Sequence, residues 1–233
     1  MPDWEQRLSA VAADHGLDDT ERRRLGVLVR RIAADEHAPT AVRIPRDIVD
    51  VHVADSLAGS VGPPIATART IVDLGSGAGF PGLPLAVANP AAHVDLVESA
   101  ARKVTFLREV VAEMGLENVA VIHARAEAWP EGLSRADAVV VRAVDSLPVL
   151  VEYAAPLLGV GGHLVAWKGR RDHAEESNGD AAAAQVGLDP VEIRPVKPYP
   201  GSRDRHLHIF VKRTATPAGF PRAPGRARKR PLR

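Results

Sequence analysis

The chain contains no cysteine, which excludes disulfide bridges, thiolate metal sites and a cysteine nucleophile. This composition agrees with a reducing compartment. No apolar run approaches the roughly 18 residues that a membrane-spanning helix needs, and the charged segment before Arg24 lacks the apolar stretch of a signal peptide. We therefore expect a cytoplasmic protein that does not use a membrane.

Acidic residues are absent from one end of the chain. Between Arg222 and Arg233 there are six basic residues and no acid, whereas the whole chain carries a net charge of only +1. A cationic tail on a slightly acidic body favours a polyanionic partner, although a solvated tail without a function is the alternative interpretation. Because the tail, residues 214–233, is also rich in Pro and Gly, we expect it to be extended or disordered.

The apolar pattern divides the chain into a helical first part and an alternating second part. Before residue 62 it predicts helices over 2–14, from Asp18 or Asp19 toward Ala38, and from Pro45 to Leu57. Later, short apolar runs alternate with helical segments. The expected strands are 70–74, 93–97, 119–123, 138–142, 162–167, 190–196 and 205–212, and the helices between them are 81–88, 102–114 and 147–158.

Alternation of this kind is typical of an α/β fold with a mostly parallel sheet covered by helices on both faces. The last two strands, joined by a turn-rich KPYPG segment, fit a closing antiparallel hairpin. The chain is long enough for one sizeable core. We expect an N-terminal helical segment (1–62) packed on one catalytic domain (63–213), followed by the tail.

The strongest local signal is the glycine-rich loop IVDLGSGAGFPG at 71–82, where an apolar strand runs into a turn and Pro81 marks a helix start. Glycines let the backbone approach a ligand closely, and a helix start offers unpaired N–H groups. We therefore expect a nucleotide-like ligand at this loop.

Two spacings fit the loop. Gly77, Gly79 and Gly82 match the dinucleotide fingerprint, whereas Asp73, Gly75, Gly77 and Gly79 match the Asp-x-Gly-x-Gly-x-Gly loop that resembles S-adenosylmethionine-dependent methyltransferases. Asp73 favours the second, because a carboxylate suits the ammonium and sulfonium of adenosylmethionine and repels a pyrophosphate.

Two further acids follow the next strands. Glu98 ends the second strand, where a carboxylate can accept both ribose hydroxyls. Ala126 and Glu127 follow the third strand, and Glu127 is a candidate acceptor for the adenine amino group. A solvated strand-end acid and an ordinary helix-start Glu are the alternative interpretations of these two residues.

Together these blocks resemble the RsmG/GidB family of bacterial 16S rRNA guanine-N7 methyltransferases. The matching motifs are 73–84 (DLGSGAGFPGLP), 103–107 (KVTFL), 125–127 (RAE), 141–143 (VRA), 167–169 (WKG), 205–207 (RHL) and 220–232 in the tail. The resemblance covers roughly residues 40–233. It departs upstream, where Val51 replaces the arginine that usually precedes the histidine, and where Ala38-Pro39-Thr40 replaces an asparagine-containing motif.

The resemblance implies a Rossmann-like class I methyltransferase with a seven-stranded sheet. It implies methyl transfer from S-adenosylmethionine to a guanine N7 in the 530 loop of 16S rRNA, near the decoding site, with naked rRNA or a small-subunit precursor as partner and a monomeric enzyme. The cofactor residues it implies are Gly75, Phe80, Glu98, Ala126, Glu127 and Arg142, beside Asp73, Gly77 and Gly79 of the loop. The RNA-binding candidates are His52, Lys103, Arg125, Lys168, Arg205 and His206.

Guanine N7 has a free lone pair, so its methylation requires no general base, and we assign no catalytic acid or base. A cation beside the guanine would oppose the positive charge that develops, so Arg142, Lys168 and Arg205 are better interpreted as phosphate or base-edge anchors. Since the chain has only nine aromatic residues, charge and shape must carry much of RNA recognition. His206 and His208 lack a third partner at suitable spacing, so we expect no metal.

Three other functions stay open at this point. A small-molecule methyltransferase would tolerate loss of the tail. A dinucleotide-dependent oxidoreductase would bind NAD at the same loop. A non-enzymatic RNA-binding protein on a vestigial fold would need no cofactor.

Overall fold

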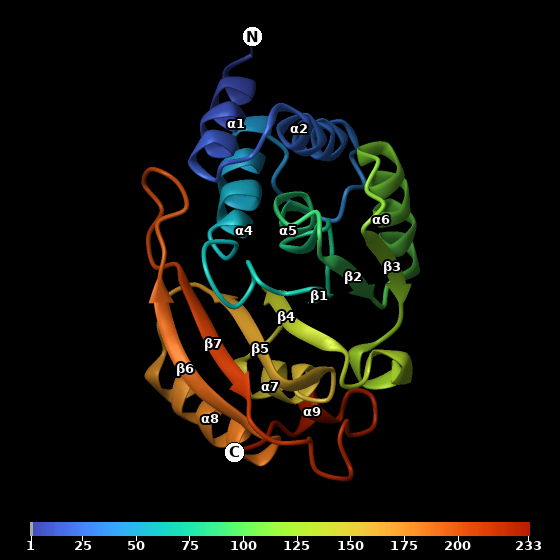
Figure 1. Ribbon diagram of the computed structural model, residues 1–233, viewed down its shortest axis with the longest axis vertical. Coiled ribbons are helices and arrows are strands. Elements are labelled where there is room, and N and C mark those ends of the chain that lie inside the picture. Colours follow the sequence, from blue (N-terminus) through green and yellow to red (C-terminus); the bar gives the residue numbers. More distant parts are fainter. Residues whose placement is uncertain (1) are drawn as a thin grey trace.

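The computed structural model of the protein describes residues 2–233, and its centre is a seven-stranded sheet (Figure 1). The strands are β1 (Thr70–Leu74), β2 (His93–Glu98), β3 (Val119–His123), β4 (Ala136–Arg142), β5 (Leu158–Lys168), β6 (Leu188–Pro195) and β7 (His206–Lys212). Their order is β3-β2-β1-β4-β5-β7-β6. The first five pair in parallel, and β7 runs antiparallel to β5 and β6. The predicted mostly parallel sheet with a closing hairpin is confirmed.

Both faces of the sheet are covered. Neighbouring residues of β1 contribute to different apolar clusters, Ile71 to one and Val72 to the other, and Val140 and Val139 of β4 divide in the same way. Successive side chains of a strand point to opposite faces. A strand buried on both sides therefore has a continuous apolar run, which is the pattern that predicted this fold.

The helices form two layers, one on each face. One layer holds α1 (Asp3–Asp14), α2 (Asp19–Ala34), α3 (Pro45–Asp47), the π-helix η1 (Ile48–Ala54), α4 (Asp55–Leu57), α5 (Gly82–Ala88) and α6 (Ala101–Met114). The other holds α7 (Leu147–Ala154) and α8 (His173–Gln185) (Figure 1). Within residues 2–233 no helix has the length and apolar character needed to cross a bilayer.

The N-terminal helices are built as the sequence predicts, with two local differences: α2 ends at Ala34, short of Ala38, and the third helix contains a π-helical segment. The Asp18 side chain caps α2 by accepting hydrogen bonds from the backbone N–H groups of Thr20 and Glu21. In turn, the Glu21 carboxylate accepts a hydrogen bond from the Asp18 N–H. The third helix starts at Pro45 but passes through the π-helix Ile48–Ala54 before α4. A π segment of this kind is frequent at functional sites, and here it carries His52.

The second half differs from the expectation in one boundary and in one additional helix. The helix expected over 147–158 ends at Ala154, and β5 already begins at Leu158. A further helix, α8, was not predicted; it begins with Asp172 as its cap and buries Ala182 and Ala183. Small alanines give a weak periodic signal, so the apolar pattern did not reveal this helix.

The expectation of an extended or disordered tail is also wrong. Residues 226–229 form the short helix α9, and Ala227 is buried in the same cluster as α7 and β4. In Figure 1 the tail returns from β7 to lie beside α7. The charge and proline content of the tail indicated that it is exposed to solvent. These local properties do not reveal that another part of the chain offers a surface on which the tail packs.

Candidate functional site

The glycine-rich loop follows β1 at the carboxyl edge of the sheet, where open α/β sheets bind ligands. Gly75 has a φ of +71°, and a Cβ there would lie 2.8 Å from the Val144 side chain. Gly77 has a φ of +59°, and the space around its missing Cβ is open. A ligand can therefore approach the loop backbone at Gly77. Gly79, with a φ of +94°, packs on Leu83 instead.

A pocket of about 100 Å³ lies beside this loop, and we call it the glycine-loop pocket. Four of the sequence-predicted cofactor residues line it, namely Gly75, Glu98, Ala126 and Glu127. Its other lining residues are Leu74, Val97, Ser99, Ala124, Arg125, Val144, Tyr153 and Arg228. The fold thus brings the ends of β1, β2 and β3 together around one concave surface.

Glu98 is held rigidly in the glycine-loop pocket. Its Oε1 accepts the N–H groups of Ser99 and Ala100 at 2.8 and 2.9 Å, and its Oε2 accepts the Gly77 N–H at 3.2 Å. The Lys103 ammonium lies 3.8 Å from the same carboxylate. These bonds fix the carboxylate at the pocket edge, and they place Lys103 beside Glu98 rather than on a separate surface.

Asp73 lies beneath the glycine-rich loop and lines neither of the pockets described here. Its side chain is fully buried; Oδ2 accepts the Gly82 N–H at 2.9 Å, and Oδ1 has no hydrogen-bond partner among the described residues. Burial raises the pKa of this carboxyl to about 7. Such a group costs free energy unless a cation or a proton compensates it.

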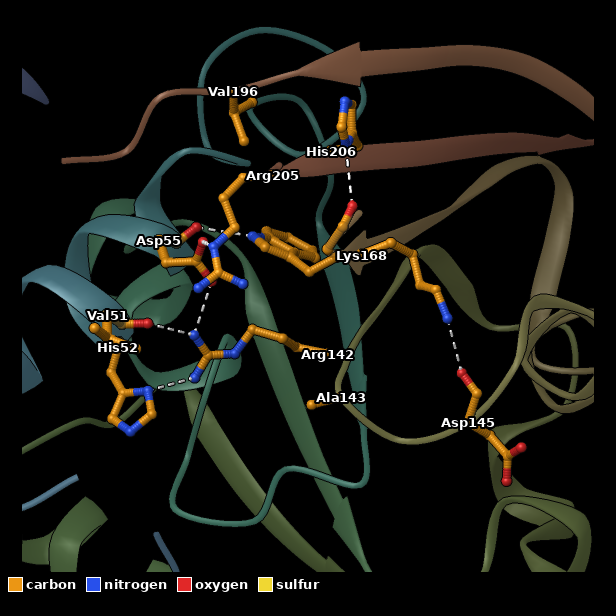
Figure 2. Close-up of a pocket in the computed structure, with 12 residues that line it drawn as sticks. Val51, His52, Asp55, Arg142, Ala143, Asp145, Lys168, Val196, Arg205 and His206 are labelled. Carbon is orange, nitrogen blue, oxygen red and sulfur yellow. Dashed lines mark hydrogen bonds and ion pairs between the residues drawn. The ribbon is translucent and has the colours of Figure 1, made fainter. Parts of the chain in front are cut away.

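A second cavity, of about 310 Å³, lies on the other side of the β4–α7 connection, and we call it the basic pocket. Five predicted residues line it, namely His52, Arg142, Lys168, Arg205 and His206. The N-terminal helix of His52 forms one wall, and the ends of β4, β5 and β7 form the others (Figure 2).

Arg142 is the centre of the basic pocket and does not line the glycine-loop pocket, where the resemblance implied a cofactor contact. Its guanidinium donates to the Val51 carbonyl and to Asp55 Oδ2, both at 2.9 Å, and to His52 Nδ1 at 3.0 Å (Figure 2). It also lies over the Phe80 ring, with 5.3 Å to the centroid. These contacts fix the arginine in a single orientation and pair its charge.

His52 joins the N-terminal helix to the glycine-rich loop. Its ring stacks on Phe80 at a centroid distance of 4.6 Å. Burial and the neighbouring Arg142 lower the pKa of His52 to about 3, so the ring is neutral at pH 7. Because Nδ1 accepts a bond from Arg142, the proton lies on Nε2, which donates to Thr40 Oγ1 at 2.8 Å.

The other predicted cations occupy different positions at this edge. Lys168 pairs with Glu175 at 2.6 Å, and His206 donates to the Gly169 carbonyl at 3.0 Å. Arg205 Nε lies 3.9 Å from Asp55 Oδ1. Arg125 is exposed and lines the glycine-loop pocket instead.

Sequence reasoning missed two residues of the site. Asp55 is 4% exposed and contacts Arg142, which is 87 positions away, while the Trp167 indole N–H donates to the Asp55 carbonyl at 2.8 Å. Arg228 of the tail lines the glycine-loop pocket. No local pattern in the sequence indicated either contact. Among residues 2–233 no group of three or more potential ligands is arranged to hold a metal ion.

Solved structures of low sequence identity share this fold. An S-adenosylmethionine-dependent methyltransferase from Aquifex aeolicus has a TM-score of 0.54 at 16% identity, covering 71% of this chain and 92% of its own. The fibrillarin pre-rRNA processing protein of Methanococcus jannaschii has a TM-score of 0.55 at 19% identity, covering 69% of this chain and 74% of its own. The predicted Rossmann-like methyltransferase fold is confirmed.

Sequence relatives are much more similar. The chain is 43% identical over 197 residues to the ribosomal RNA small subunit methyltransferase G of Rubrobacter xylanophilus, covering 82% of this chain and 76% of that protein. The protein of the same name from Deinococcus radiodurans is 39% identical over 240 residues, covering 99% and 94%. The family model described as rRNA small subunit methyltransferase G matches residues 32–207. The chain therefore belongs to the rRNA small subunit methyltransferase G (GidB) family.

Proposed function

We propose that the protein transfers a methyl group from S-adenosylmethionine to N7 of a guanine in the 530 loop of 16S rRNA. The observation that carries this proposal is the pair of pockets at the carboxyl edge of the sheet. One is formed by the glycine-rich loop with Glu98 and Glu127, and the other by Arg142, Lys168 and Arg205. The 142–146 connection lines both pockets, with Val144 at the first and Ala143 and Asp145 at the second, so a cofactor and a base can meet there.

The residues of the glycine-loop pocket fit adenosylmethionine. Glu98 is positioned to accept ribose hydroxyls and Glu127 to accept the adenine amino group. Gly77 does not line the pocket, but its backbone is uncrowded, since a Cβ there would meet only the Gly75 carbonyl oxygen, at 3.8 Å. Asp73, buried beneath the loop with an unpartnered oxygen, supplies a negative potential that suits a cationic ligand. A pyrophosphate would be repelled by Asp73, which disfavours the dinucleotide alternative.

The chemistry demands little of the protein beyond positioning. The cofactor supplies an electrophilic methyl group on a sulfonium, and the guanine N7 lone pair attacks without losing a proton. The residues therefore hold two reactants in line and exclude water, an effect that accounts for most of the barrier reduction in such reactions. Arg142 contributes an oriented donor for a base edge or phosphate, and Asp55 balances its charge as the guanine ring becomes cationic.

The remaining cations fit an RNA backbone. Lys168, Arg205 and His206 line the basic pocket, and the exposed Arg125 lines the glycine-loop pocket at the same edge of the sheet. We propose that they bind phosphates of 16S rRNA or of a small-subunit precursor, which positions the loop without reading its sequence. The enzyme would then act as a monomer in the cytoplasm.

The test is a methylation map of 16S rRNA from a strain that lacks this protein. We expect 7-methylguanosine to disappear from the 530 loop and to return when the wild-type gene is restored. A Gly77→Asp gene should not restore it, because the new carboxylate enters the space through which a ligand reaches the loop. Full methylation in the deletion strain would refute the proposal.

A further inference from the structure

The tail, residues 214–233, is anchored to the catalytic domain. Arg222 forms a two-pronged ion pair with Glu152 of α7, with Nε 2.6 Å from Oε1. Glu152 is only 2% exposed, and Ala227 of α9 is also 2% exposed. A buried carboxylate that lost its arginine would be strongly destabilising, so Arg222 and Ala227 fix the tail against α7.

From this anchor, two groups of the tail reach the glycine-loop pocket. The Gly225 N–H donates to Glu127 Oε1 at 2.9 Å. Arg228 lines the pocket directly, and its Nε lies 2.6 Å from Asp145 Oδ2. The candidate acceptor for adenine is therefore oriented by the tail. Burial and the adjacent Glu127 raise the pKa of Tyr153 to about 12, so the phenol beside Glu127 in the glycine-loop pocket is neutral.

Arg228 also fastens the wall between the two pockets. Asp145, its ion-pair partner, lines the basic pocket, and Val144 lines the glycine-loop pocket. Val144 packs so closely over Gly75 that any Cβ at Gly75 would meet it at 2.8 Å. Arg228 therefore helps to hold the 142–146 connection over the glycine-rich loop, together with Lys168, whose ammonium donates to the Asp145 carbonyl at 3.2 Å.

The basic residues of the tail divide into two kinds. Arg222 and Arg228 form ion pairs with carboxylates of the domain, although the Arg228 side chain is still 57% exposed, whereas Arg226, Lys229, Arg230 and Arg233 form no ion pair with the described residues. A tail that only attracted a polyanion would not need arginines paired with carboxylates of its own domain. The engaged arginines have a role within the protein itself.

We propose that the tail is a strap that closes the adenosine end of the cofactor pocket, with Arg228 as a positioning residue. This inference rests on the proposed function in one respect, namely that the ligand of the glycine-loop pocket is adenosylmethionine. It assigns the basic tail to cofactor binding as well as to any contact with RNA.

The test is calorimetric titration of the full chain with S-adenosylhomocysteine, without RNA. We expect Arg228→Ala to weaken the affinity about threefold, because a partly exposed ion pair that orients the pocket wall is lost. Arg228→Lys should recover part of the loss. The matched control is Arg226→Ala, which removes the same charge from the same short helix without touching the pocket, and it should bind as the wild type does.

A second readout follows the tail itself. Trypsin cleaves at the basic residues of α9, and a strap that closes on the ligand should be cut several-fold more slowly when S-adenosylhomocysteine is bound. Intact-mass measurement of the released tail gives the rate. Arg228→Ala should lose most of this protection.

The outcomes separate this inference from the proposed function. Equal affinity of wild type and Arg228→Ala for S-adenosylhomocysteine would overturn the strap and leave the proposed function standing. An equal loss in Arg226→Ala would also overturn it, because net charge and not the contact would then be responsible. If the wild type does not bind S-adenosylhomocysteine at all, the strap and the proposed function both fail.

Discussion

Asp73 illustrates how burial changes the chemistry of one residue. Its folded-state pKa of about 7 lies above the ordinary value of 3.8, so this carboxyl contributes stability that is fully present below pH 3.8 and is lost as the pH rises through 7. Asp73→Asn keeps an acceptor for the Gly82 N–H and cannot titrate. Between pH 4 and pH 8 the wild type should lose on the order of 3 kcal/mol of unfolding free energy that the variant keeps. Denaturant titrations across that range measure the difference, and parallel curves would contradict the burial argument.

His52 shows the opposite dependence. Its folded-state pKa of about 3 lies below the ordinary 6.5, so its contribution to stability is present above pH 6.5 and is lost as the pH falls toward 3. We expect the melting temperature of the wild type to fall more steeply below pH 6 than that of His52→Gln. His37, which is exposed, provides the control variant His37→Gln, whose profile should follow the wild type. If the melting temperature of the wild type depends on pH in the same way as that of His52→Gln, protonation of the His52 ring does not destabilise the folded protein.

At the scale of a single element, α2 depends on its cap. Asp18 satisfies two backbone N–H groups that the helix cannot pair internally, and α2 buries Leu25, Leu28, Val29 and Ile32 in the core shared with the sheet. Asp18→Ala should therefore lower the unfolding free energy of the whole protein by about 1 kcal/mol. Glu36→Ala, an exposed acidic residue beyond the end of the helix, should change it by less than about 0.5 kcal/mol. Chemical denaturation of the three proteins measures both effects.

At the scale of the whole molecule, the N-terminal helices are part of the core. Leu8, Leu25 and Ile32 belong to the same buried cluster as Leu83 of α5 and Leu107 of α6. Each large apolar side chain contributes about 2 kcal/mol when buried, and a domain is stable by only about 5–15 kcal/mol in total. A chain shortened to residues 45–233 should therefore lack a cooperative thermal transition and should precipitate at low temperature. A sharp transition near that of the full chain would show that this segment is an independent appendage.

The local sequence determined the features that depend on neighbours in the chain. Apolar runs of strand length separated by helical periods predicted the sheet and both helix layers. A strand that is buried on two faces consists of consecutive apolar residues, and this run can be recognised in the sequence. The loop from Asp73 to Gly82 predicted a ligand site, because a turn with positive φ at positions 75 and 77 requires glycine there and these glycines are visible in the sequence. The cap at Asp18 belongs with these features.

Only the tertiary structure decided which residues face each other. It placed Arg142 in the basic pocket with Asp55, and it brought Arg228 of a tail expected to be extended or disordered to the glycine-loop pocket. Both ion pairs join residues more than 80 positions apart, so no periodicity or spacing encodes them. Such a contact is favourable only where the Coulomb attraction exceeds the cost of desolvating the charges, and this requires that the sheet and its helices first bring the partners within reach.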